Sequence, residues 1–329
     1  MKILFLTANM QGYVSLNFYY WLEELKKHVD VVTYGRDYPN FVDDRPIHDV
    51  IREFYGTDRP DYIVQYTETV GSWSGNFRKM EEITDIPKVM IYTDTHNYPE
   101  SRSSWINAWK FDLVLMPVMS EKHQPVYEKL LKCPIKLFPQ SLEPTLFYDY
   151  MMPKTYDVVF AGIDIPTFYP LRHKMLVRME ELKREGKITF HSPPHPWYNR
   201  KTEAEYEELY QKKGCLWKDR YAKFLNSGKM CLFDGGMYNV AISRYMECMA
   251  TKCLVLAPMP FNGKALGYVD GENMVAVGEH DFEEKMLFYL HDDAERKRIT
   301  ENAYELVQRK HLNNTRVLEF IGLLSEIHK

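Results

Sequence analysis

Short apolar runs alternate with amphipathic stretches along the first half of the chain. The stretch 15–28 places apolar side chains at positions 18, 21, 22 and 25, which is the spacing of one helix face. Between such stretches lie apolar runs that predict strands, at residues 3–6, 29–34, 62–65, 89–93, 113–118 and 135–138. An alternation of strands and helices predicts a parallel sheet with helices on both faces.

The pattern is interrupted once and then begins again. Residues 139–155 hold three prolines and no clear period, which is typical of a connection between domains. After it, strand and helix patterns alternate again up to a C-terminal region that is helical throughout. We therefore expect an N-terminal domain over 1–145, a second domain over 146–310, and a C-terminal helix over 311–329 that packs back on the first domain. The predicted fold class is α/β, with two Rossmann-like domains facing a central cleft, and ligands are expected beyond the carboxyl ends of the strands.

Composition narrows the class of protein and its partners. Lys and Arg number 42 against 46 Asp and Glu, so the net charge of −4 gives no electrostatic reason to expect nucleic acid as a partner. Five cysteines, an odd number without a C-x-x-C pair, favour reduced thiols and a cytoplasmic location. The N-terminal apolar run is too short for a signal peptide, and no run approaches the ~20 residues of a membrane span.

Two glycine-rich motifs are absent from the sequence, and their absence excludes two kinds of nucleotide site. The text after the first predicted strand, "ANMQGYVSLN", holds the single Gly12 where a nicotinamide-binding fold would show G-x-G-x-x-G, and no P-loop motif occurs. We therefore expect no cofactor. Gly12 has two interpretations: it lets a ligand, such as an acceptor, approach the backbone, or it is a turn glycine.

The stretch "FDGGMYNVAISRYMECMA" (233–250) is the strongest candidate for a binding site. It predicts a strand end, Gly235-Gly236, and a helix whose N-terminus would favour an anion such as a phosphate. Glu247 would lie ~10 Å along this helix, about the distance from a diphosphate to a ribose, and a carboxylate accepts two hydroxyl hydrogen bonds. On spacing alone, an Arg244–Glu247 surface pair is the favoured interpretation.

At this point the chain resembles a known family. The segments "YDVVFAGIDIPTFYPLRHKML", "SRYMECMATKCLVLAP" and "DGENMVAV" are similar to the C-terminal domain of GT-B glycosyltransferases, in particular the group of the spore-maturation protein CgeB. The resemblance implies that Glu247 holds the donor ribose. It also implies donor contacts by Arg244, Gly162, Gly236 and Arg172, the last of which is otherwise a solvated helix charge.

The sequence departs from the wider superfamily at one position. A motif of Glu, seven residues and Glu is common there, and its first Glu corresponds to Asn239. Asn239 can hydrogen-bond a hydroxyl of the donor or cap a helix. No Asp-x-Asp metal motif occurs, which agrees with GT-B enzymes that need no metal ion.

Further candidates follow predicted strands. Asp94 and His96 come directly after the strand 89–93 and suit a general base or a group that orients an acceptor hydroxyl, although a loop held by Asp and Asn turns explains them too. Trp197, in the loop "HSPPHPWYNR", could stack on a base or sugar, or simply belong to a rigid loop.

The function hypothesis from the sequence is a metal-independent, retaining glycosyltransferase of the hexosyltransferase type. It would move a sugar from a nucleotide-diphosphate sugar to a glycan, protein or small-molecule acceptor. Two alternatives remain: a nucleotide-sugar epimerase of the same fold, and a non-catalytic sugar-nucleotide-binding or coat-assembly protein. Release of nucleoside diphosphate from a donor would distinguish the glycosyltransferase from both alternatives.

Overall fold

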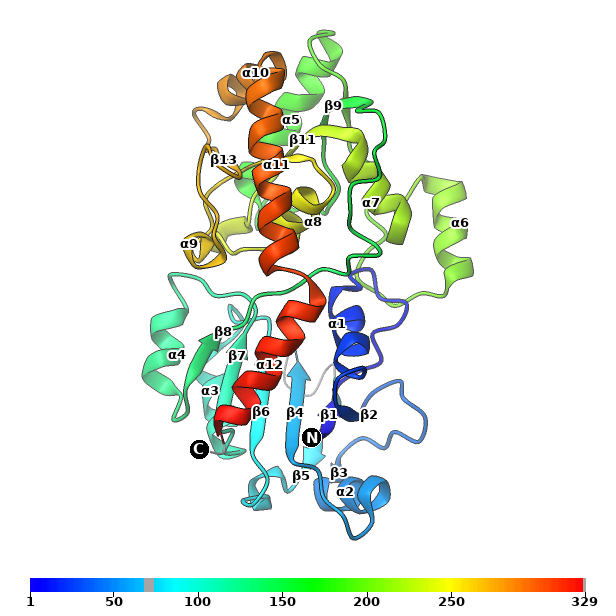
Figure 1. Cartoon of the computed structure of the whole chain (residues 1–329), viewed down its shortest axis with the longest axis vertical. Helices are drawn as coiled ribbons and strands as arrows, with labels where there is room; N and C mark the ends of the chain where they lie inside the picture. The colour runs from blue at the N-terminus through cyan, green and yellow to red at the C-terminus, as the bar shows by residue number, and fades with distance from the viewer. Residues whose placement is uncertain (68–73, 328–329) are drawn as a thin grey trace. The chain divides into compact units, whose positions relative to one another are not determined.

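A computed structural model describes residues 1–67 and 74–327 and divides the chain into two compact units (Figure 1). Unit 1 comprises Met1–Met10, Trp21–Gln140 and Arg316–Lys329, and unit 2 comprises Gln11–Tyr20 and Ser141–Thr315. The sequence predicts the division after residue 145, and the structure has it after Gln140. The short segment 11–20, which the sequence places in the first domain, belongs to unit 2.

Unit 1 is built on a six-stranded sheet in which every neighbouring pair is parallel. In sheet order, its strands are β2 (Asp30–Tyr34), β1 (Lys2–Leu6), β4 (Tyr62–Thr67), β6 (Lys88–Tyr92), β7 (Leu113–Met116) and β8 (Ile135–Leu137). β3 (Arg45–Pro46) and β5 (Phe77–Arg78) form a separate pair. The helices are α2 (Ile47–Tyr55), η1 (Met80–Glu82), α3 (Pro99–Ala108), α4 (Gln124–Leu130), most of α1 (Asn17–Leu25) and most of α12 (Asn313–Ile327).

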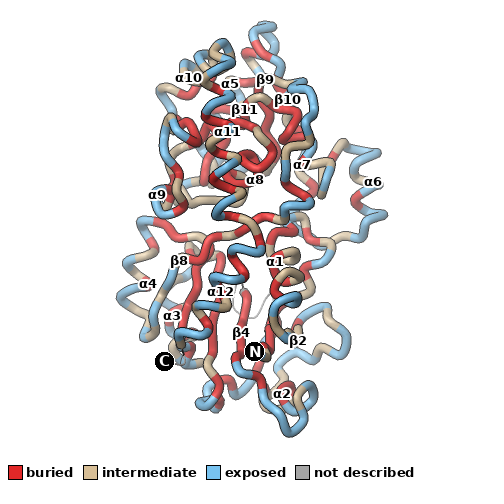
Figure 2. Tube along the Cα trace, viewed as in Figure 1, coloured by how far each residue is buried: buried red, intermediate tan, exposed pale blue. Residues whose placement is uncertain are grey.

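Both faces of this sheet are covered, which explains its continuous apolar runs. Leu4 and Leu6 of β1 pack in one cluster with Ile47 and Val50 of α2. Phe5 points to the other face, because side chains alternate along a strand, and its ring centroid lies 6.1 Å from that of Trp21 in α1. The inner strands β1, β4, β6 and β7 are accordingly buried along most of their length (Figure 2). A sheet buried on both faces needs apolar residues at successive positions.

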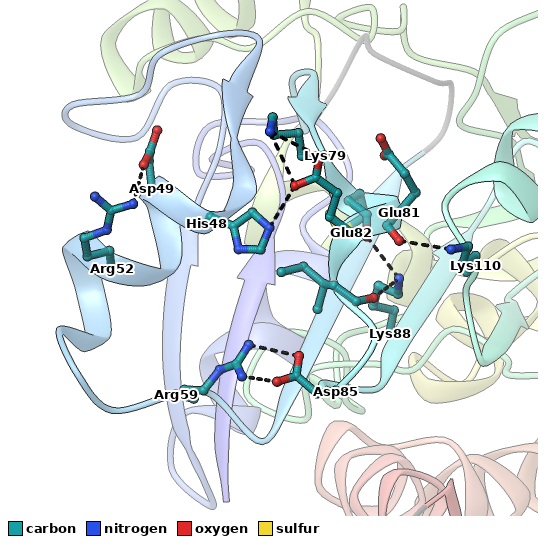
Figure 3. Close-up of polar contacts among 12 residues, drawn as sticks. His48, Asp49, Arg52, Arg59, Lys79, Glu81, Glu82, Asp85, Lys88 and Lys110 are labelled. Carbon is teal, nitrogen blue, oxygen red and sulfur yellow. Dashed lines mark hydrogen bonds and ion pairs between the residues drawn. The ribbon is translucent and has the colours of Figure 1, made fainter.

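Lys88 is a buried cation at the amino end of β6 that the sequence pattern did not single out (Figure 3). Its Nζ donates to the carbonyl oxygens of Met80 and Ile83, at 3.0 and 2.7 Å, and so holds the η1 turn against the sheet. Burial lowers the pKa of Lys88. The lysine lies at the end of β6 opposite to Asp94 and His96, so its role is structural.

Unit 2 has a five-stranded, wholly parallel sheet. In sheet order, its strands are β10 (Phe190–His191), β9 (Tyr156–Val159), β11 (Gly228–Leu232), β12 (Leu254–Ala257) and β13 (Val275–Ala276). Its helices are α5 (Pro170–Arg184), α6 (Glu203–Lys213), α7 (Lys218–Ser227), η2 (Gly236–Tyr238), α8 (Arg244–Ala250), α9 (Gly263–Leu266), α10 (Phe282–His291) and α11 (Asp293–Lys310). α6 lies at the periphery of the unit and is mostly exposed (Figures 1 and 2).

The predicted helix after Gly236 is wrong in its extent. Gly236 and Asn239 both have left-handed backbones, with φ of 71° and 46°. They confine the first turn to the short 3-10 helix η2, and α8 begins only at Arg244 with seven residues. The N-terminus expected to face an anion therefore does not exist at Gly235-Gly236. None of the helices in the described residues is long and apolar enough to cross a membrane.

Candidate functional site

Arg244, the first residue of α8, forms the centre of a cationic site in unit 2. Its guanidinium carbon lies 5.3 Å from the ring centroid of Phe160 and 5.7 Å from that of Phe233, just after β9 and β11. A Cβ at Gly162 would come within 2.7 Å of Nη2 and 2.9 Å of Nη1. Only glycine therefore leaves room for the guanidinium beside the end of β9.

The Arg244 guanidinium keeps hydrogen-bonding capacity. Its Nε and Nη1 are buried and have no hydrogen-bond partner among the described residues. Burial acts to lower the pKa of Arg244, but its surroundings, which include the Glu247 carboxylate, hold the pKa above its usual value, so the group stays charged. A buried guanidinium with unused N–H groups suits an anion with several oxygens, because planar paired donors match carboxylate and phosphate geometry.

Arg172 is buried on α5, so its interpretation as a solvated helix charge is wrong. Nε donates to Asp234 Oδ1 at 3.2 Å, Nη1 to the Ile163 carbonyl and Nη2 to the Asp234 carbonyl, both at 2.7 Å. The guanidinium carbon also lies 3.5 Å from the ring centroid of Tyr169. Burial, and next the charge of Arg244, lower the pKa of Arg172. The two arginines therefore act on one region, and contact of Arg172 with a diphosphate stays a prediction.

Gly236, the first residue of η2, and Asn239, the residue after η2, flank this region. The Gly236 N–H donates to Asp234 Oδ1 at 3.2 Å, and a Cβ on Gly236 would lie 2.9 Å from the Phe168 ring and 3.0 Å from the Tyr169 ring. Asn239 ends η2 and donates from Nδ2 to the Met259 carbonyl at 2.7 Å. Its Oδ1 is buried without a partner among the described residues, so it keeps an acceptor for a ligand hydroxyl.

Glu247 is buried in α8, and the interpretation as a surface pair with Arg244 is wrong. Oε1 accepts from Asn17 Nδ2 at 3.0 Å and Oε2 accepts from the Tyr221 hydroxyl at 2.6 Å. Burial, followed by the Glu247 charge, raises the pKa of Tyr221, so this hydroxyl remains a donor. Each carboxylate oxygen has a second lone pair, so Glu247 can still accept from a ligand. No local signal in the sequence pointed to Asn17 or Tyr221.

The loop after β10 carries His195, Trp197 and Tyr198. Within unit 2, this loop contacts the segment 11–20. His195 Nδ1 accepts a hydrogen bond from the Trp197 N–H at 2.9 Å. Trp197 is 62% exposed and has a left-handed backbone with φ of 63°. The ring of Tyr198 lies 4.9 Å from that of His195, between centroids, and 6.3 Å from that of Tyr13.

Gly12 is fixed by this same part of unit 2, although the sequence places it on the acceptor side. Its carbonyl accepts from the Lys201 N–H at 2.9 Å and from the Tyr206 hydroxyl at 3.2 Å. Gly12 has φ of 81°, and a Cβ there would lie 2.3 Å from the Lys201 carbonyl oxygen. Close backbone approach and turn conformation thus both explain the glycine.

In unit 1, Asp94 and His96 lie in the loop between β6 and α3. Burial raises the pKa of Asp94, and the neighbouring His96 and Arg102 only partly offset this effect. The loop is held by hydrogen bonds from the Tyr92 hydroxyl to the Asp94 carbonyl, at 3.2 Å, and from Thr95 Oγ1 to the Val118 carbonyl, at 3.3 Å. A carboxyl with a raised pKa beside an imidazole suits acid–base chemistry.

Side chains that could hold a metal ion do not cluster in the described part of the chain. Over residues 1–67 and 74–327, no group of three or more His, Cys, Asp or Glu has a suitable arrangement. The five cysteines are free thiols.

Comparison with known proteins relates this arrangement to one family. Residues 172–322 match the family model described as "Glycosyl transferase-like", a range that includes Arg172, Arg244 and Glu247. Sucrose-phosphate synthase from Thermosynechococcus elongatus has a similar structure over 100% of this chain and 99% of its own, with a TM-score of 0.70 and 16% identity. The chain has the GT-B glycosyltransferase fold.

Two further solved GT-B structures are similar to this chain in fold. HepE from Anabaena, in complex with UDP-glucose, is similar over 99% of this chain and 100% of its own, with a TM-score of 0.64 and 12% identity. TarM is similar over 80% of this chain and 54% of its own, with a TM-score of 0.56 and 14% identity. No curated protein matches in sequence. The resemblance to GT-B glycosyltransferases is therefore confirmed, and the relation to the CgeB group stays a prediction.

Proposed function

We propose that this protein is a glycosyltransferase that takes its sugar from a nucleotide-diphosphate sugar bound to unit 2. The observation that carries the proposal is the Arg244 guanidinium, which is charged, is buried at Nε and Nη1, and has no acceptor for either in the described part of the chain. It lies in the segment that matches the glycosyl transferase-like family. A donor diphosphate supplies the acceptor oxygens, and Arg244 stabilises the charge that develops on the leaving nucleoside diphosphate.

The other donor contacts are assigned around Arg244. Gly162 leaves room for the Arg244 guanidinium, Gly236 leaves room for the Phe168 and Tyr169 rings beside Arg172, and Arg172 adds positive charge. Glu247 accepts from the ribose hydroxyls with its remaining lone pairs, and Asn239 Oδ1 accepts from a sugar hydroxyl. Trp197 is exposed and stacks on the base or the sugar.

The acceptor is assigned to unit 1, where Asp94 and His96 lie after β6. There they orient an acceptor hydroxyl or exchange its proton. The acceptor is a glycan, a protein or a small molecule with a free hydroxyl. Because the family resemblance favours it, we assign a retaining, metal-independent transfer of a hexose.

A donor panel tests the proposal. UDP-, ADP-, GDP- and dTDP-glucose are screened by thermal shift, since a bound ligand stabilises by RT ln(1 + [L]/Kd). The HepE complex makes UDP-glucose the first choice. Any donor that binds is then assayed for release of nucleoside diphosphate with candidate acceptors. Binding without release favours a non-catalytic protein, an altered sugar on an intact donor favours an epimerase, and no binding contradicts the proposal.

A further inference from the structure

His195 is fixed in one tautomer by its own loop. A backbone N–H can only donate, so the hydrogen bond from Trp197 to Nδ1 makes Nδ1 the acceptor. In the neutral ring the proton then sits on Nε2. The left-handed backbone of Trp197, rare for a bulky residue, shows that the loop holds this geometry against a local cost.

The charged side chains that act on His195 come from three elements, and all are cations. They are Arg244 of α8, Arg172 of α5 and Lys201 of the loop before α6, while Tyr198 of the same loop packs beside the ring. Burial first, and these cations second, lower the pKa of His195 to about 4. Protonation at Nδ1 would also oppose the Trp197 N–H. Burial, charge and the hydrogen bond therefore all keep the ring neutral.

The fixed tautomer and the surrounding cations favour hydrogen-bond donation by a neutral imidazole. A neutral imidazole donates through Nε2 without adding charge to a region that already holds two arginines. Arg244 in the same region has N–H groups on Nε and Nη1 that find no acceptor within residues 1–67 and 74–327. We propose that His195 is a donor-binding residue that donates a hydrogen bond from Nε2 to the diphosphate of the nucleotide sugar. This inference rests on the proposed function and adds a residue that the family resemblance did not indicate.

The test is a binding titration of the full chain by calorimetry, with the glucose nucleotide from the panel that binds. Its diphosphate has no group that titrates near neutral pH, so any proton exchange belongs to the protein. His195→Ala is expected to weaken binding roughly ten- to a hundredfold, the effect of losing a hydrogen bond to a charged group. His195→Gln, which places an amide N–H near the position of Nε2 and cannot ionise, is expected to stay within about threefold of wild type.

Wild-type protein gives a second readout that needs no variant. In two buffers of different ionisation enthalpy, binding should take up no proton through His195, and affinity should stay constant within about threefold between about pH 5 and 8. His191→Gln is the matched control. His191 lies on β10, stacked on Tyr156 with 5.4 Å between ring centroids, and should bind like wild type.

Two results overturn the inference while the proposed function stands. In one, His195→Ala binds the donor as wild type does. In the other, affinity rises tenfold on acidification through about pH 6 and His195→Gln abolishes the rise, which would make the bound form a cation. If no glucose nucleotide binds to wild type, the donor site itself is wrong, and the inference falls with it. Should His195→Ala unfold, the wild-type proton balance and the His195→Gln titration decide.

Discussion

At the scale of single residues, Arg244 combines a proposed function in binding with a cost in stability. Its buried Nε and Nη1 have no partner among the described residues, and leaving such a group unpaired costs ~1–3 kcal/mol. We predict that Arg244→Gln weakens binding of the nucleotide sugar roughly ten- to a hundredfold, because a charged hydrogen bond is lost. The melting temperature should stay equal or rise. Titration calorimetry and thermal unfolding measure the two effects.

Arg178 offers the matched control for Arg244. Its guanidinium forms two hydrogen bonds to Glu283, both 2.7 Å, at the partly exposed surface of unit 2. Arg178→Gln should leave donor affinity unchanged. A variant at Arg244 that binds the donor like wild type would remove the observation on which the proposed function rests.

Glu247 differs from Arg244, because its carboxylate already accepts hydrogen bonds from protein side chains and therefore contributes to stability. Glu247→Ala leaves Asn17 Nδ2 and the Tyr221 hydroxyl without their acceptor, so we predict lower stability together with donor affinity weakened roughly ten- to a hundredfold. Tyr221→Phe removes one of these hydrogen bonds and keeps the carboxylate. It should lower stability while affinity changes less than in Glu247→Ala. A folded Glu247→Ala protein with full affinity would make Glu247 structural only.

These residues also show what sequence can and cannot predict about the site. Arg244, Glu247 and Gly162 stand in segments with a recognisable family pattern, so the sequence indicated them. Asn17 is 230 residues away from Glu247, and their contact exists only in the folded chain. His195 stood in a loop without a motif, and its neighbours come from three separate elements.

At the scale of elements, the strands were predicted well and the helix after β11 was not. Strands buried on both faces leave a continuous apolar run, which is a strong local signal. A local pattern does not reveal where the backbone turns left-handed. Gly236 and Asn239 do so within four residues, which ends η2 and delays α8 to Arg244.

The loop after β1 gives a prediction at this scale. Gly12→Ala would place a Cβ 2.3 Å from the Lys201 carbonyl oxygen on a backbone with φ of 81°, so the loop must shift. We expect ~1–3 kcal/mol of destabilisation, as for strained backbone positions. Thermal unfolding measures it. Gly186→Ala on the same unit, also left-handed at φ of 69° but with open space around it, separates the clash from the backbone strain.

At the scale of the whole molecule, the proposed division of labour predicts a separable effect. His96 belongs to unit 1, whereas Arg244, Glu247 and His195 belong to unit 2. His96→Ala should therefore cut the rate of transfer while donor affinity stays near wild type. A positioned acid–base group contributes ~10²–10⁴ in rate, and less where it only orients the acceptor. Paired titration and rate measurements on one preparation check this. Reduced donor affinity with an undiminished rate on bound donor would reverse the assignment.

Chelation tests whether the proposed transfer needs a metal ion. Since Arg244 supplies positive charge at the proposed diphosphate site, transfer should persist in excess EDTA after dialysis. The measurement is the initial rate before and after chelation, with Mg²⁺ and Mn²⁺ added back. Activity that is lost with EDTA and restored by either ion would assign the charge neutralisation to a metal instead.

The segment 11–20 has a consequence for recombination between related genes. Unit 2 is not encoded by one continuous stretch, because most of unit 1 separates ten of its residues, Gln11–Tyr20, from the rest. A chimera joined after Gln140 would pair residues 141–315 with another protein's segment in the place of Gln11–Tyr20. It would exchange Asn17, the partner of Glu247, and the Gly12 carbonyl that accepts from Lys201 and Tyr206. If unit 1 holds the acceptor, as proposed, an exchange of acceptor specificity by swapping whole units requires that these ten residues stay with unit 2.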